Sequence, residues 1–256
     1  MRVTEEFRSL HVPGRPLVLV NAWDVASARI AEQAGARAVA TTSAGVAWSL
    51  GAPDGDALGR DDAIGLVGRV ARAVGVPVTA DIESGYGSPD ETVRAVAATG
   101  AAGVNLEDGD RGVDEQVKLL AAARAAGPGL FLNARMDAYL RGTGELDEVV
   151  ARAEAYVAAG ADGIFVPGMV DLATVKELAA RIPAPLNVMA VSGGPSVAEF
   201  AAVGVARVSL GSAVAQAAYA VVERATVEAL TSGTYAAVDG ALDYGRLNNL
   251  MTGYSA

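Results

Sequence analysis

The chain has 256 residues, of which 52% are hydrophobic and only 5% aromatic, so it can bury an aliphatic core sufficient for one large domain or two small ones. Its formal net charge of −10 disfavours nucleic acid and anionic membrane surfaces as partners. The absence of cysteine excludes disulfides, thiolate metal sites and a cysteine nucleophile.

The first segment, residues 1–16, is charged and contains two prolines, which predicts neither a signal peptide nor a membrane anchor. No apolar run approaches the roughly 20 residues that a membrane span requires. We therefore expect a cytoplasmic protein without a membrane partner. His11 lies in this leader, where a packing or surface role is expected rather than catalysis.

Short apolar runs recur along the chain, and each is followed by a turn and an Ala-rich stretch with helical periodicity. The runs predict eight strands, at residues 17–20, 38–42, 77–81, 103–106, 130–134, 162–166, 185–189 and 206–210. Most of the stretches end in a helix-capping glycine. They predict helices at residues 25–35, 62–75, 90–100, 114–127, 145–160, 174–182, 196–204 and 213–230, with a helical tail at about 239–252.

Alternation of buried strands with helices predicts an α/β fold with a parallel sheet, and eight units in this length predict a (β/α)₈ barrel. A doubly wound open sheet is the alternative, but its glycine-rich turn is missing after the first strand. We expect one barrel domain over residues 1–256, with a helical extension from about residue 212. That extension exceeds what one barrel helix needs, so it is a candidate oligomer contact.

Active sites of such barrels lie at the carboxyl ends of the strands, where this sequence places many polar residues. Asp81 ends the third strand, Glu83 points the same way if the extended geometry persists, and Glu107 follows the next strand. These carboxylates predict a site for Mg²⁺ or Mn²⁺, because both ions prefer oxygen ligands. The alternative is that each acid caps a helix or pairs with an arginine.

Two further features of the rim suit an anionic ligand. Residues 41–45 (TTSAG) can present backbone N–H groups to a carboxylate, although an ordinary tight turn is the alternative. Arg135 can bind a carboxylate or phosphate with two parallel hydrogen bonds, or can simply neutralise the rim acids. A phosphate site at Gly193, Gly194 and Gly211 would instead indicate sugar-phosphate chemistry.

Six motifs, taken together and in order, resemble the isocitrate lyase and phosphoenolpyruvate mutase superfamily from about residue 17 to 215. They are VNAWDVASARIAEQAG, TTSAGVAWSLGAPDG, PVTADIESGYG, GVNLEDG, LNARMDA and PLNVMA. The resemblance implies a (β/α)₈ barrel whose last helix is exchanged between subunits, in a tetramer or dimer. It also implies Mg²⁺ and a small 2-oxo carboxylate substrate.

Residue roles carried over from the resemblance fall into three groups. Asp81 resembles the main metal carboxylate, with Glu83 and Glu107 holding Mg²⁺ through its waters. Arg135 resembles the arginine that steadies an enolate, and Asp54 a loop acid near the metal. Substrate-binding positions are implied for Trp23, Asp24, Ser43, Ala44, Gly45 and Asn187.

The chain departs from the family after the fourth strand, where NLEDG leads directly into a helix without the longer loop that carries the lyase cysteine and histidine motif. Decarboxylation of a 2-oxo acid needs no base, and water or Tyr86 can return the proton. The resulting hypothesis is a Mg²⁺-dependent lyase that cleaves a carbon–carbon bond at C3 of a small 2-oxo acid or its adduct, by oxaloacetate decarboxylase-like or methylisocitrate lyase-like chemistry. The alternatives are a phosphonopyruvate or carboxyphosphonoenolpyruvate mutase or hydrolase, and a non-catalytic 2-oxo acid-binding barrel.

Overall fold

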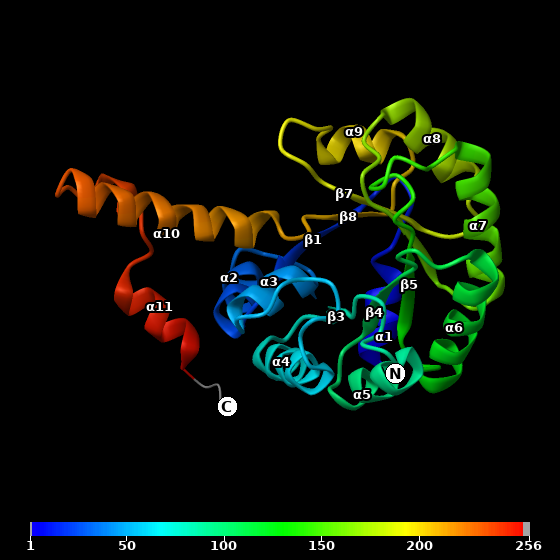
Figure 1. The fold of residues 1–256 in the computed structure, drawn as a ribbon, viewed down its shortest axis with the longest axis horizontal. Helices are drawn as coiled ribbons and strands as arrows, with labels where there is room; N and C mark the ends of the chain where they lie inside the picture. Colours follow the sequence, from blue (N-terminus) through cyan, green and yellow to red (C-terminus); the bar gives the residue numbers. More distant parts are fainter. Residues whose placement is uncertain (1, 253–256) are drawn as a thin grey trace.

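The computed structural model describes residues 2–252, and its centre is a closed barrel of eight parallel strands in the order β1 to β8 (Figure 1). Each strand pairs with its sequence neighbours, and β1 closes the barrel against β8 through the pair Leu17 and Arg207. The predicted (β/α)₈ barrel and its eight strands are confirmed. The strands are β1 (Leu17–Ala22), β2 (Val39–Thr41), β3 (Val78–Asp81), β4 (Gly103–Glu107), β5 (Phe131–Arg135), β6 (Gly163–Val166), β7 (Leu186–Met189) and β8 (Arg207–Ser209).

Helices form wherever the periodic Ala-rich stretches predicted them. These are α2 (Val25–Gln33), α4 (Arg60–Ala73), α5 (Pro89–Ala98), α6 (Val113–Ala126), α7 (Leu146–Ala158), α8 (Leu172–Arg181), α9 (Val197–Ala202), α10 (Ala213–Thr231) and α11 (Tyr244–Met251). Of these, α2 and α4 to α9 surround the barrel, whereas α10 leads away from it (Figure 1). Three further helical segments were not predicted, namely α1 (Arg2–Ser9), α3 (Ser43–Ser49) and the 3₁₀ turn η1 (Ala236–Val238). No helix of the described chain is both long and apolar enough to cross a bilayer.

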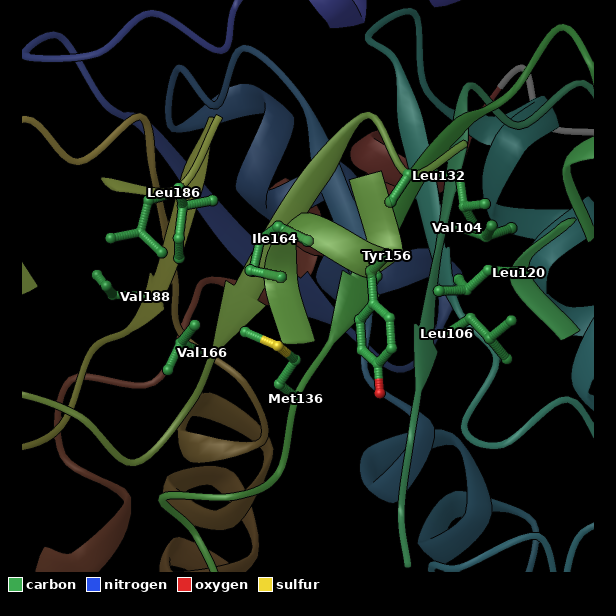
Figure 2. Close-up of a cluster of buried hydrophobic side chains, with 14 of the residues drawn as sticks. Val104, Leu106, Leu120, Leu132, Met136, Tyr156, Ile164, Val166, Leu186 and Val188 are labelled. Atoms are coloured by element: carbon green, nitrogen blue, oxygen red, sulfur yellow. The ribbon is translucent and has the colours of Figure 1, made fainter. Parts of the chain in front are cut away.

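The main hydrophobic core fills the space between the barrel and its outer helices. Leu106 and Ile164 point outward from β4 and β6, and Leu120 of α6 and Tyr156 of α7 meet them there (Figure 2). All four side chains are fully buried. This packing holds each strand in place from outside and leaves the barrel interior free for polar residues.

The amino-terminal leader closes the bottom of the barrel instead of remaining a polar extension. Phe7 of α1 is fully buried and meets Phe131 edge to face, with ring centroids 5.5 Å apart. His11 stacks on the same ring at 4.2 Å, and its Nδ1 bonds the carbonyl oxygen of Phe7 at 2.9 Å. The expected packing role of His11 is thus confirmed, and the leader contributes to the core.

His11 is expected to make the fold acid-sensitive. Burial, aided by the nearby Arg207, lowers its pKa to about 3, whereas an unfolded histidine titrates near 6.5. The unfolded chain therefore binds a proton below about pH 6.5 that the folded chain refuses, so stability falls as the pH drops toward 3. We expect His11→Phe to remove ~2 kcal/mol of the stability loss between pH 7 and pH 5, measured by urea unfolding. An identical pH dependence in variant and wild type would contradict this.

Candidate active site

A cavity of about 200 Å³ opens at the carboxyl ends of the strands, where barrel enzymes place their chemistry. One side of it is polar and the other is apolar. The lining residues are Asn21, Thr42, Ser43, Ala44, Asp54, Asp81, Asn105, Arg135, Leu140, Phe165, Pro167, Met189, Ser209, Gly211 and Ser212. Of the candidate site residues from the sequence, the cavity brings together Ser43, Ala44, Asp54, Asp81 and Arg135.

Asp81 stands at the end of β3, where its carboxylate enters the cavity. One carboxylate oxygen accepts hydrogen bonds from the hydroxyl of Ser43 at 3.0 Å and from its backbone N–H at 3.3 Å. The backbone N–H of Asp81 donates to the hydroxyl of Thr41 at 3.0 Å. These bonds orient the carboxylate and tie it to the start of α3, so the segment 41–45 is the entrance to a helix and not an isolated turn.

Glu83 does not extend the line of Asp81, and the expectation of a continued strand is wrong. The strand ends at Asp81, and Glu83 adopts a left-handed backbone with φ +50°. Its buried carboxylate accepts the backbone N–H groups of Gly55, at 2.9 Å, and of Asp56. Tyr86 donates its hydroxyl to the other oxygen at 3.2 Å. Glu83 thereby anchors the loop that presents Asp54 to the cavity.

Burial raises the pKa of Glu83, and the negative charges of Asp54, Asp56 and Asp81 raise it further. The hydrogen bond from the backbone of Asp56 opposes this shift. Burial likewise raises the pKa of the Tyr86 hydroxyl, and the charge of Glu83 adds to the effect. Tyr86 therefore stays protonated at neutral pH; its hydroxyl donates to Glu83, and Tyr86 is not among the residues that line the cavity. Its assignment as proton donor stays a prediction.

Arg135 is the cation of the cavity and is held between two acids. Its Nη1 lies 2.7 Å from Glu107, and its Nε lies 2.7 Å from Asp137. Burial lowers the pKa of Arg135, but attraction to Asp81, Glu107 and Asp137 outweighs burial, so the net shift is upward. For Glu107 the balance is reversed: burial exceeds the pull of Arg135 and raises its pKa to about 8.

The charges around the cavity fit a divalent cation. Asp81, Glu107 and Asp137 surround the guanidinium of Arg135, and Asp54 adds a further acid to the cavity lining. Burial is the main cause of the raised pKa of Glu107, and the charges of Asp81 and Asp137 add to it. Within residues 2–252, no three His, Cys, Asp or Glu side chains converge as they would around a directly ligated ion. Mg²⁺ keeps several waters and needs only one or two protein carboxylates, so the geometry is compatible with such an ion. The metal-binding roles of Asp81, Glu83 and Glu107 stay predictions.

Another acid of the rim has a structural role. Asp108 is almost fully buried and accepts hydrogen bonds from Arg152 at 2.8 Å and from the hydroxyl of Tyr156 at 2.9 Å. It also accepts the backbone N–H of Asp137 at 3.0 Å. Asp108 thus ties α7 to the turn that carries Asp137, which in turn grips Arg135.

Four predicted substrate positions lie outside the cavity lining. Asp24 accepts the backbone N–H of Ser27 at 2.7 Å and caps α2. Trp23 packs on Gly45, where an added Cβ would lie only 2.9 Å from the Trp23 Cβ. Asn187 is buried in the barrel interior and accepts a hydrogen bond from Ser209 at 3.2 Å. Their roles in substrate binding stay predictions.

Sequence reasoning missed the apolar wall and one buried cation. Leu140, Phe165, Pro167 and Met189 form the apolar side of the cavity. Arg207 lies fully buried in the barrel interior below the cavity. Its signal was available, since an arginine two residues before Ser209 in a buried strand must share the inward face with that serine.

The chain is similar to known proteins that are named for different activities, and to an uncharacterized one. An uncharacterized protein, Rv1998c, of Mycobacterium tuberculosis is 40% identical over 80% of this chain and 81% of its own length. The oxaloacetate decarboxylase of Ectopseudomonas mendocina is 33% identical over 75% of this chain and 71% of its own. The 2-methylisocitrate lyase of Escherichia coli is 31% identical over 70% of each chain.

Solved structures share the whole architecture. A proposed phosphonomutase of Burkholderia cenocepacia J2315 is 42% identical, with a TM-score of 0.85 over 89% of this chain and 100% of its own. A phosphonopyruvate hydrolase in complex with oxalate and Mg²⁺ is 25% identical, with a TM-score of 0.85 over 98% of this chain and 95% of its own. The family Phosphoenolpyruvate phosphomutase matches residues 7–231. With this match over most of its length, the chain belongs to the phosphoenolpyruvate phosphomutase family, within the isocitrate lyase and phosphoenolpyruvate mutase superfamily.

Proposed function

We propose that the protein is a Mg²⁺-dependent lyase that cleaves a carbon–carbon bond at C3 of a small 2-oxo acid or of its adduct. The observation that carries the proposal is the convergence of Asp81 and Arg135 on one small cavity. Relatives named as a decarboxylase of oxaloacetate and a lyase of 2-methylisocitrate support carbon–carbon chemistry. The complex of a similar hydrolase with oxalate and Mg²⁺ supports the metal.

The chain's own residues divide the work between charge and orientation. Bound Mg²⁺ would supply Lewis-acid stabilisation for developing negative charge, and Asp81 would hold it. Arg135 offers a second positive charge to an enolate oxygen, already fixed by Glu107 and Asp137. Ser43 and Ala44 line the cavity at the start of α3, where they would face the substrate carboxylate. Leu140, Phe165 and Met189 keep one side of the cavity dry.

Decarboxylation suits this set of residues. The departing CO₂ leaves its electron pair in the enolate, so the step needs no general base. The cavity lining, as described, contains no histidine to take the proton of a substrate hydroxyl, and the chain contains no cysteine. An oxaloacetate-like 2-oxo acid is therefore the substrate class that fits best, ahead of an isocitrate-like hydroxy acid.

A turnover screen tests the proposal. Oxaloacetate, 2-methylisocitrate, isocitrate, citramalate-type acids and phosphonopyruvate are each incubated with Mg²⁺, with and without EDTA, and pyruvate or phosphoenolpyruvate release is followed. We expect Mg²⁺-dependent release of pyruvate from an oxaloacetate-like acid and its loss in EDTA. Turnover of phosphonopyruvate alone, seen by phosphorus NMR, would favour the mutase or hydrolase alternative. Silence on all substrates, with oxalate still stabilising the fold, would favour a binding barrel.

We also propose that α10 packs against a second copy of this chain. It is 19 residues long, leads away from the barrel, and carries Val222 and Leu230 with 62% and 82% of their surfaces exposed (Figure 1). Such an apolar helix face is unusual for an isolated chain. Exchange of this helix between subunits in a dimer or tetramer would bury it.

Charging this face is expected to reduce the oligomer to a monomer of 25.8 kDa. We expect the double change Val222→Glu and Leu230→Glu to do so, because burying two carboxylates in an apolar contact is costly. Light scattering after size-exclusion chromatography measures the mass. The control is Val191→Glu, at an exposed valine outside α10. A monomeric wild type would contradict the proposal.

A further inference from the structure

The interior of the barrel below the cavity is unusually polar. Barrels of this type normally fill this layer with branched apolar side chains. Here, beside apolar residues such as Leu19 and Phe165, it includes six buried side chains with hydrogen-bonding groups, namely Asn21, Asn105, Asn133, Asn187, Arg207 and Ser209. Asn21, Asn105 and Ser209 also line the cavity, so this layer forms its floor.

Arg207 is the charged member of this layer. Its side chain is completely buried, and no carboxylate of the described chain lies within ion-pair distance of it. Its Nη1 has no hydrogen-bond partner among the described residues. Burial lowers the pKa of Arg207 to about 9, with Asp81 opposing the shift, so the side chain remains a cation at neutral pH. A buried cation without a paired anion is costly to the fold, which calls for a functional reason.

One branch of hydrogen bonds from Arg207 reaches Asn105. Its Nη2 donates to Oδ1 of Asn105 at 3.3 Å, and Nδ2 of Asn133 donates to the same oxygen at 2.9 Å. Because two donors hold this oxygen, the amide cannot flip without losing both bonds. The N–H groups of Asn105 are therefore the part of the side chain left to face the cavity.

The other branch runs through Ser209. Nε of Arg207 donates to the hydroxyl oxygen of Ser209 at 3.0 Å, and that hydroxyl donates to Oδ1 of Asn187 at 3.2 Å. This fixes the direction of the serine hydroxyl. It also fixes the Asn187 amide, whose Nδ2 is buried without a partner in the described part of the chain.

We propose that Arg207 is a positioning residue for the anionic ligand: it orients Asn105 and Ser209 on the cavity floor and places a positive charge beneath it. The proposal rests on the proposed function, because it takes the ligand to be a small carboxylate. The acids around the cavity would repel such an anion, and a cation below the floor offsets that repulsion. Arg207 acts through Asn105 and Ser209, and it does not itself line the cavity.

The test compares Arg207→Met with wild type in three measurements: calorimetric titration of Mg²⁺ alone, titration of oxalate in saturating Mg²⁺, and urea unfolding. We expect oxalate affinity to fall about ten- to thirtyfold, because a unit charge one side chain away from the ligand is lost at an effective dielectric near 20. Mg²⁺ alone should bind as tightly as before or more tightly, since a repelling charge is gone. Stability should be unchanged or higher, because no buried anion loses its partner.

Two further variants separate this role from a structural one. Arg207→Lys keeps the positive charge but lacks the planar guanidinium that bonds Asn105 and Ser209 together, so it should recover part of the oxalate affinity. Arg124→Met removes the same charge at the opposite end of the barrel, where Arg124 pairs with Asp162 and holds the carbonyl oxygen of Leu130 at 2.8 Å. We expect that control to lower stability and to leave oxalate affinity unchanged.

The outcomes distinguish the two proposals. Equal oxalate affinity in Arg207→Met and wild type would overturn the role of Arg207 while the proposed function stands. Parallel losses of Mg²⁺ affinity, oxalate affinity and stability would also overturn it, because they would show a structural role. If the wild type binds neither oxalate nor Mg²⁺, the proposed function is overturned. The assignment of a small carboxylate to the cavity floor is then overturned as well.

Discussion

Replacing Asp81 by asparagine is expected to abolish metal-dependent turnover, with a fall in kcat/KM of about 10³-fold or more, because the metal's main carboxylate is lost. Asparagine has nearly the same shape, so its amide oxygen can keep the hydrogen bonds that Ser43 donates at 3.0 and 3.3 Å. The change thus removes a charge without removing the contact. Steady-state kinetics across a Mg²⁺ titration measures the effect on the substrate that the screen identifies.

The fold should tolerate this change. Asp81 lies among other acids, and its charge contributes to the raised pKa of Glu107. Removing it relieves repulsion, so the free energy of unfolding is expected to stay within ~1 kcal/mol of wild type or to rise. Asp110→Asn is the matched control, since Asp110 is an exposed acid of the same rim and pairs with Arg141. Full metal-dependent turnover in Asp81→Asn would remove Asp81 from the metal site.

The barrel was readable from the sequence because its physical signals are local. Most strands are short apolar runs buried on both faces, and the helices between them repeat small and apolar residues at helical spacing. Two helices, α1 and α3, escaped prediction for identifiable reasons. Within α1, Phe7 is a single fully buried anchor in a charged segment. The start of α3 consists of small residues that are equally typical of turns.

The site was predictable only as far as strand geometry reaches. Asp81 and Arg135 were found because they end strands, and a barrel brings strand ends together. Glu83 was placed wrongly because the two-residue alternation stops where the strand stops, and its left-handed backbone is set by bonds to a loop that precedes it by almost thirty residues. Arg207 was missed because arginine is rarely buried, so it was not considered as an inward-facing residue of its strand.

Replacing Arg135 by methionine is expected to lower kcat by about 10² to 10³-fold, because a preorganised hydrogen-bond donor at a developing oxyanion is lost. Variants of this residue can also separate the effect of its charge from the effect of its orientation. Arg135→Lys keeps the charge but cannot contact Glu107 and Asp137 with the same fork, so an intermediate rate is expected. Arg135→Met also leaves both acids unpaired. The side chain is partly exposed, which reduces the cost to about 1–3 kcal/mol of unfolding free energy.

The stability loss and the rate loss can be separated with a double variant. Adding Asp137→Asn to Arg135→Met removes one of the two orphaned charges and should restore part of the stability, measured by urea unfolding. It should restore none of the turnover, because Asp137 grips Arg135 and does not line the cavity. Recovery of kcat together with stability would mean that Arg135 supports the fold of the rim and does not act on substrate. A rate for Arg135→Met within about tenfold of wild type would argue against its role at an enolate oxygen, since one such donor is worth more.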